Sequence, residues 1–131
     1  MGRRGLQQLS KIRLREAQSL VGGGLYDGAY YLAGYAVECA LKACIAQETR
    51  RHDFPDKKKA EASHKHNLVE LVKVANLDDD RRAEAKRDEA FRKNWDIVQS
   101  WSEESRYRII QQQEALTLVE AVAQKNHGVL Q

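Results

Sequence analysis

The residues with the clearest chemical potential lie inside an apolar segment, residues 29–43, which reads AYYLAGYAVECALKA. A glutamate and a lysine interrupt it, and together with two of its three tyrosines they follow spacings of 4, 3 and 4: Tyr31, Tyr35, Glu38 and Lys42. These spacings place all four side chains on one face of a helix, beside the apolar residues. Because an unpaired buried carboxylate is strongly unfavourable, we expect Glu38 to have a partner.

Two interpretations of this polar stripe remain open. In the first, it faces a partly hydrated groove or a neighbouring helix, and an arginine or tyrosine of the core satisfies Glu38. In the second, it is the floor of a polar cleft in which Glu38 orients Arg106 and the tyrosines offer hydroxyls or stacking faces to a nucleotide. Lys42 follows Glu38 by four residues, the favourable order for a helical ion pair.

A second candidate group is the tripeptide Ser105, Arg106 and Tyr107, which we expect at a break between two helices. A functional interpretation has Arg106 bind phosphate through its planar guanidinium while Tyr107 stacks on a base. A structural interpretation has Arg106 bridge to Glu38 and Tyr107 close the core. The two are compatible.

The basic part of the chain is the segment 50–66, which holds six lysines and arginines against three acids. Such a segment is commonly a solvated run of charge. If it is a binding surface, Lys57 and Lys58 would contact phosphates, which sets affinity and salt dependence without reading sequence. The net charge of +3 is modest and is weak evidence for nucleic-acid binding.

The same segment contains His64 and His66 in a His-x-His pattern. This spacing lacks the features of a structural zinc motif, so we expect no metal site. We expect His66, which directly precedes Asn67, to help cap or orient a helix. A role for His64 or His66 as a general base is the alternative.

The spacing of apolar residues predicts helices throughout the chain. Glycines 22–24 should end the first helix, Asn67 should cap the third, and the acids 78–80 suit the start of the fourth. The expected helices cover about 6–21, 27–48, a short stretch after 67, 81–101 and 111–125. We therefore predict an all-α protein, an up-and-down antiparallel bundle of about five helices in a single domain, residues 1–131.

Composition narrows the class of protein. The 131 residues are 42% hydrophobic and 31% charged, as in a globular protein. No uncharged apolar run reaches the roughly 18–20 residues that cross a bilayer, and the N-terminus lacks the apolar core of a secretory signal. We expect a cytoplasmic protein that does not associate with membranes.

Four segments in order, LYDGAYYLAGYAVECALKACIA, FPDKK, HNLVELVK and WSEESRY, resemble the HEPN domain family over residues 6–130. The resemblance implies a helical bundle that forms a homodimer. It also implies a role in toxin–antitoxin or defence-type modules, commonly beside a minimal nucleotidyltransferase partner, with RNA or a nucleotide as ligand. We expect no cofactor.

Many HEPN proteins are metal-independent ribonucleases that use an arginine followed, after four to six residues, by a histidine. The counterpart of that arginine is Arg106, but positions 110–113 read Ile-Gln-Gln-Gln. An arginine alone cannot move protons at neutral pH, so we expect a binding component. The alternatives are a divergent endoribonuclease that pairs Arg106 with His64 or His66, and a purely structural dimerisation module.

Overall fold

The computed structural model describes residues 2–51, 66–124 and 128–130. Within these ranges the chain is all helical, which confirms the predicted fold class, and it contains no β-strand. The elements are α1 (Arg3–Gly22), α2 (Tyr26–Arg51), α4 (Leu68–Val74), α5 (Asp78–Arg87), α6 (Glu89–Gln99), the 3-10 helix η1 (Glu103–Tyr107) and α7 (Gln112–Ala123).

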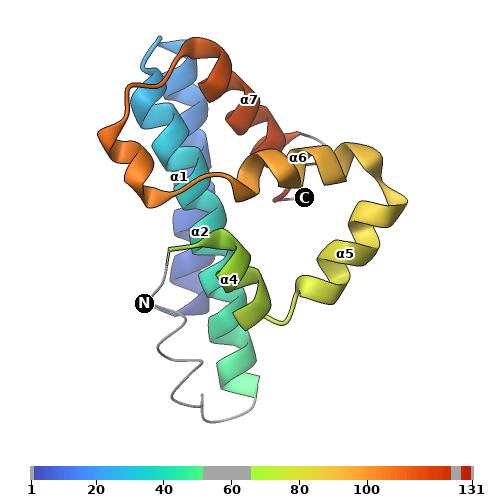
Figure 1. Cartoon of the computed structure of the whole chain (residues 1–131). Helices are drawn as coiled ribbons and strands as arrows, with labels where there is room; N and C mark the ends of the chain where they lie inside the picture. Colours follow the sequence, from blue (N-terminus) through green and yellow to red (C-terminus); the bar gives the residue numbers. More distant parts are fainter. Residues whose placement is uncertain (1, 52–65, 125–127, 131) are drawn as a thin grey trace.

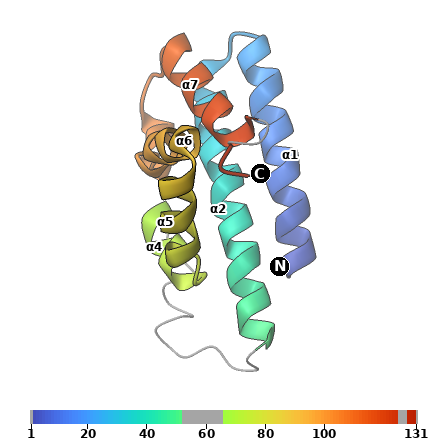
Figure 2. The same ribbon diagram turned by 90° about the vertical axis from the view of Figure 1, so that its right-hand side faces the viewer.

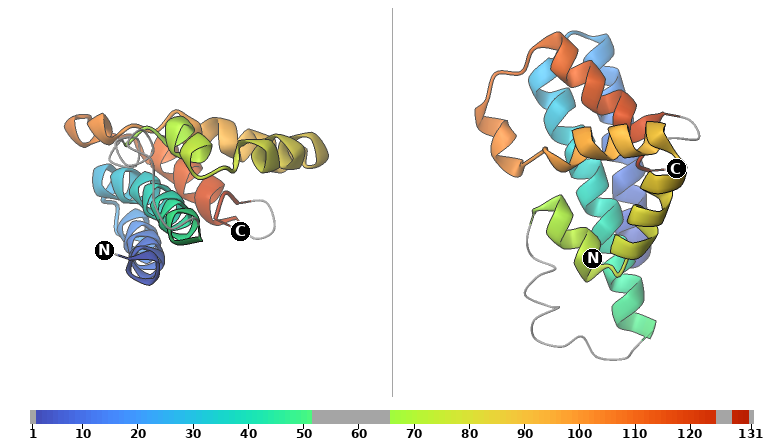
Figure 3. Two further views of the ribbon diagram at one scale, coloured as in Figure 1. Left: turned by 90° about the horizontal axis from the view of Figure 1, so that it is seen from below. Right: turned by 45° about the vertical axis from the view of Figure 1, so that its right-hand side comes forward.

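The helices form layers around α2. Helices α1 and α2 run side by side as a long antiparallel pair (Figure 1). The view turned by 90° places α1 on one outer side, α2 with α7 in the middle, and α4 to α6 on the other side (Figure 2). The views in Figure 3 confirm this order and show α6 running crosswise to α2. As a result, α2 contacts other helices on both sides and carries the core.

Small residues let α1 approach α2 closely. Ala29, Ala33 and Ala36 are completely buried, and the hydroxyl of Ser10 donates a hydrogen bond of 2.7 Å to the carbonyl oxygen of Ala36. A serine can reach a helical carbonyl in this way only where side chains between the backbones are small. These alanines of α2 therefore form a packing surface for α1.

The predicted helix 81–101 is wrong in one respect, because it is two helices, α5 and α6. The chain is extended at Asp88, and the carboxylate there accepts a hydrogen bond of 3.1 Å from the backbone N–H of Phe91, as an N-cap does. On the inner face of α6, Trp95 and Val98 are buried.

Trp101 fixes the segment after α6 against α2. Its side chain is 3% exposed, and it packs so tightly on Gly34 that a β-carbon there would lie 2.2 Å from two indole atoms. Glycine is the one residue type that allows this approach. The contact sets the position of η1, which begins two residues later.

None of the helices in the described part of the chain is long and apolar enough to cross a membrane.

Candidate functional site

Glu38, the carboxylate of the polar stripe, is buried and has two partners. Its exposed fraction is 1%. The ammonium of Lys42, one turn further along α2, lies 3.3 Å from Oε2. The Nδ1 atom of His66 lies 3.0 Å from both carboxylate oxygens. Two potential cations thus face one buried carboxylate, which offsets the cost of its desolvation.

The start of α4 holds His66 in place. Asn67 is the N-cap, as predicted, and its Oδ1 accepts a hydrogen bond of 3.1 Å from the backbone N–H of Glu70. Because His66 directly precedes this cap, its backbone lies at the start of α4. From there its imidazole reaches Glu38 on α2.

His66 also joins α2 to η1. Its Nε2 lies 3.3 Å from Oε2 of Glu103, so each ring nitrogen faces a carboxylate. The imidazole therefore bridges two carboxylates. Lys42, Glu38, His66 and Glu103 form one continuous polar network.

The expected ion pair between Arg106 and Glu38 is wrong, since the described partners of Glu38 are Lys42 and His66. The reason is the helix type of η1. With about three residues per turn, a 3-10 helix aligns side chains three apart. Glu103 reaches the imidazole of His66. Arg106 comes one turn later on the same face of η1, and its side chain is exposed to solvent.

Arg106 instead lies among aromatic side chains. Its guanidinium carbon is 5.0 Å from the centre of the Tyr107 ring, a cation–π contact. The phenolic oxygen of Tyr107, and to a smaller extent that of Tyr31 and the charge of Glu103, raises the pKa of Arg106. A permanently charged guanidinium is thus presented to solvent next to the network.

The tyrosines of α2 continue the site toward Trp101. The rings of Tyr31 and Tyr35 are stacked, 6.1 Å apart at 7°, and Tyr31 tilts against Trp101 at 6.0 Å. Burial, followed by the neighbouring Cys39 and Glu38, raises the pKa of Tyr35. Tyr35 is therefore a neutral structural member of the stripe, whereas Tyr31 joins the aromatic core to Arg106.

A cavity of about 390 Å³ lies beside this network, and we call it the polar groove. Its lining comes from the start of α4, from the segment between α6 and η1, and from the first two residues of η1. Its lining residues are His66, Asn67, Trp101, Ser102, Glu103 and Glu104.

The other predicted site residues lie as follows. Tyr107 is 77% exposed, so the interpretation that it closes the core is wrong. Ser105 is buried, and its hydroxyl has no hydrogen-bond partner among the described residues. His64, Lys57 and Lys58 lie outside the described residues.

Sequence reasoning missed Glu103 and Glu104 as site residues. The sequence signal is weak, because Glu103 precedes Arg106 by three residues and this spacing aligns the two side chains closely only if the segment is a 3-10 helix. We find no metal site within residues 2–51, 66–124 and 128–130. In these ranges no group of three or more histidine, cysteine, aspartate or glutamate residues could hold a metal ion.

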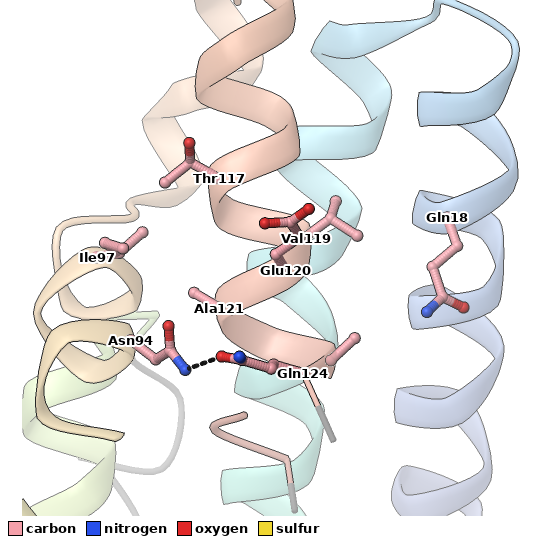
Figure 4. A pocket seen from close by; sticks show the side chains of 9 residues that line it. Gln18, Asn94, Ile97, Thr117, Val119, Glu120, Ala121 and Gln124 are labelled. Carbon is pink, nitrogen blue, oxygen red and sulfur yellow. Dashed lines mark hydrogen bonds between the residues drawn. The ribbon is translucent and has the colours of Figure 1, made fainter. Parts of the chain in front are cut away.

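A second cavity, about 560 Å³, contains none of the predicted site residues. Figure 4 shows it over α7, with Gln18 contributed by α1 and Asn94 and Ile97 by α6. The Asn94 amide donates a hydrogen bond of 2.8 Å to the Gln124 side chain. Its lining has one ionisable side chain, Glu120, whereas the lining of the polar groove has three.

Comparisons with known proteins identify the family. Neither the search of curated proteins nor the search of solved structures gave a match. The family model of the HEPN domain, a nucleotide- and RNA-related family, matches residues 6–125. The chain therefore belongs to the HEPN domain family.

Proposed function

We propose that this chain is the RNA- or nucleotide-binding component of a toxin–antitoxin or defence-type module. In this proposal residues 1–131 act as one domain that forms a homodimer and has a minimal nucleotidyltransferase as partner. The observation that carries the proposal is the exposure of Arg106 and Tyr107 side by side in η1, the helix whose first two residues line the polar groove.

The chemistry of these two side chains supports a nucleic-acid ligand. The planar guanidinium of Arg106 can donate two parallel hydrogen bonds to a phosphate. The exposed ring of Tyr107 offers a face on which an unpaired base can stack. Because the two groups are adjacent, a phosphate and a base of one strand can reach them together.

The other basic side chains of the site are less available. Lys42 and His66 both face Glu38, so phosphate binding there would compete with an existing contact. Arg106 therefore has the main binding role, and Lys42 supports the network. We propose Lys57 and Lys58 as additional phosphate contacts.

Replacing Arg106 with alanine should weaken binding of single-stranded RNA about tenfold. One lost phosphate contact should also reduce the slope of log affinity against log salt by about 0.7. Fluorescence anisotropy with a labelled heptanucleotide at several KCl concentrations measures both quantities. Because Arg106 is exposed, the free energy of unfolding should stay unchanged.

The matched control is Arg92→Ala. Arg92 is an exposed arginine on α6 whose partner is Glu89, 3.6 Å away. It should bind RNA with the affinity and salt slope of the unmutated protein. Equal binding by Arg106→Ala and the unmutated protein would exclude Arg106 as the phosphate contact. If Arg106→Ala instead lowers stability and the unmutated protein binds no RNA, the structural dimerisation module is favoured.

One observation favours a second function, a divergent metal-independent endoribonuclease. The Nδ1 atom of His66 is held by a buried carboxylate, as in the histidine–carboxylate pairs that orient a catalytic imidazole. Its Nε2 faces Glu103, so a substrate would have to displace that contact before proton transfer. Arg106 would stabilise the charge of the transition state.

The same RNA samples test this alternative. Cleavage in EDTA that disappears in both His66→Ala and Arg106→Ala would establish it. Intact RNA after prolonged incubation with the unmutated protein would remove it. The His64→Ala variant distinguishes the two candidate histidines. If cleavage is lost in His64→Ala and kept in His66→Ala, the general base is His64.

A further inference from the structure

We propose that the polar groove is a base-recognition subsite that selects guanine in single-stranded RNA. This inference rests on the proposed RNA binding and names the base that the site prefers. It follows from the donors and acceptors that line the groove.

The charge of the groove excludes phosphate as its occupant. Two glutamates, Glu103 and Glu104, line it directly, and the buried Glu38 lies behind His66. Ionised carboxylates only accept hydrogen bonds and repel anions. A strand bound at Arg106 would therefore place its phosphate outside the groove, and the group that enters must carry N–H donors.

Glu104 is the free acceptor. An oxygen of Glu103 is engaged by His66, whereas the carboxylate of Glu104 forms no hydrogen bond or ion pair within the described ranges. Only its backbone N–H is used, as the donor of a 3.2 Å hydrogen bond to the hydroxyl of Ser102. Among the described residues, both oxygens of this carboxylate are therefore open to a ligand.

Two donors accompany this acceptor in the lining. The Oδ1 of Asn67 is used in the cap of α4, which fixes the amide and leaves its NH₂ group as a donor. The oxygen of Ser102 accepts from the backbone of Glu104, so its hydroxyl hydrogen is free to donate. The groove therefore offers a carboxylate together with neutral donors.

Guanine is the base that matches this set. Its Watson–Crick edge carries two adjacent donors, N1–H and the N2 amino group, with the O6 acceptor beside them. Adenine and cytosine present an amino group next to acceptors, and uracil presents one N–H between two acceptors. A carboxylate such as Glu104 can accept both donors of guanine at once, and Asn67 or Ser102 can donate to O6.

Size and position agree with this assignment. The cavity of about 390 Å³ falls in the range of small-ligand pockets, and the indole of Trp101 forms part of its wall. Arg106 and Tyr107 follow Glu104 in the same 3-10 helix. A strand whose base enters the groove would thus meet a phosphate contact and a stacking ring on the same short helix.

The test uses three labelled RNA heptamers, a run of uridines with guanosine, inosine or adenosine at the centre. Inosine keeps N1–H and O6 but lacks the N2 amino group. Anisotropy titrations of the unmutated protein should give affinity about tenfold higher for the guanosine heptamer than for the adenosine heptamer. The inosine heptamer, which loses one of the proposed hydrogen bonds and keeps the others, should have an affinity between those of the guanosine and adenosine heptamers.

In Glu104→Gln the ratio of guanosine to adenosine affinity should fall to about one, because an amide cannot accept two hydrogen bonds side by side. Glu89→Gln, an exposed glutamate on α6 paired with Arg92 and Lys93, should keep the full ratio. Each of these two variants removes one negative charge from the surface. A difference between their guanosine-to-adenosine affinity ratios therefore reports recognition of the base and not general electrostatics.

Equal affinity for the three heptamers, still dependent on Arg106, would overturn the guanine assignment and leave the proposed function intact. A guanosine preference that persists in Glu104→Gln would also overturn it. If none of the heptamers binds, the proposed function itself fails, and the guanine assignment fails with it.

Discussion

Replacing Gly34 with alanine should lower the free energy of unfolding by about 2 kcal/mol. The added β-carbon would lie 2.2 Å from two atoms of the Trp101 indole, which is itself buried between α2 and η1. Trp101 must move, and the polar groove that it lines must change shape. The better helix propensity of alanine, about 0.5–1 kcal/mol, offsets only part of this cost. Urea denaturation followed by far-UV circular dichroism measures the difference.

Gly22→Ala is the matched control. Gly22 is the last residue of α1, and an added β-carbon there meets nothing within 4 Å. This variant should unfold at the same urea concentration as the unmutated protein or slightly above it. An unchanged midpoint for Gly34→Ala would mean that the tight packing of Trp101 on α2 does not exist in solution.

Replacing His66 with alanine should cost about 2 kcal/mol of stability, because it leaves the buried Glu38 with Lys42 alone. Removing one partner of a fully buried ion pair typically costs about 3–5 kcal/mol. The smaller value is expected here since the His66 side chain is 41% exposed, and water can partly replace it.

A double-mutant cycle with Glu38→Gln isolates this interaction. In the Glu38→Gln background, where no buried charge remains, His66→Ala should cost less than about 1 kcal/mol. The two changes should therefore couple by more than about 1 kcal/mol. Strict additivity would show that the imidazole does not stabilise the carboxylate. Glu103→Gln provides a control, because its carboxylate is partly exposed and should couple with His66 by less.

The helices were largely predictable because their signals are local. The glycines after α1 and the N-cap at Asn67 are residue types with strong positional preferences, and the apolar spacing identified α2 and α7. The break at Asp88 was missed because it contains neither glycine nor proline. An aspartate can cap a new helix as well as lie on the exposed face of a continuous one.

The site was predictable only in part. The position of Glu38 in an apolar helix required a partner, and the sequence placed Lys42 one turn away. It could not distinguish His66 from Arg106, because both approach α2 through tertiary structure. That choice depends on the 3-10 geometry of η1, which directs Glu103 to His66 and leaves Arg106 in solvent. The sequence of η1 does not reveal that this short segment is a 3-10 helix.

The homodimer, the nucleotidyltransferase partner and the phosphate contacts of Lys57 and Lys58 stay predictions. They depend on other molecules or on residues outside the described ranges, and the residues described do not test them. The molar mass measured by sedimentation equilibrium would show whether the protein forms a homodimer.

The most direct test of the central claim, that RNA binds at the polar groove, uses the two tryptophans of the chain as reporters. Trp101 lines the groove, whereas Trp95 is buried elsewhere, beneath the guanidinium of Arg81 at 5.7 Å. In ¹⁵N-labelled protein titrated with the guanosine heptamer, the indole N–H signal of Trp101, assigned with a Trp95→Phe variant, should shift while that of Trp95 stays in place. A shift of Trp95 alone, or bound RNA with neither signal moving, would contradict the assignment of the site.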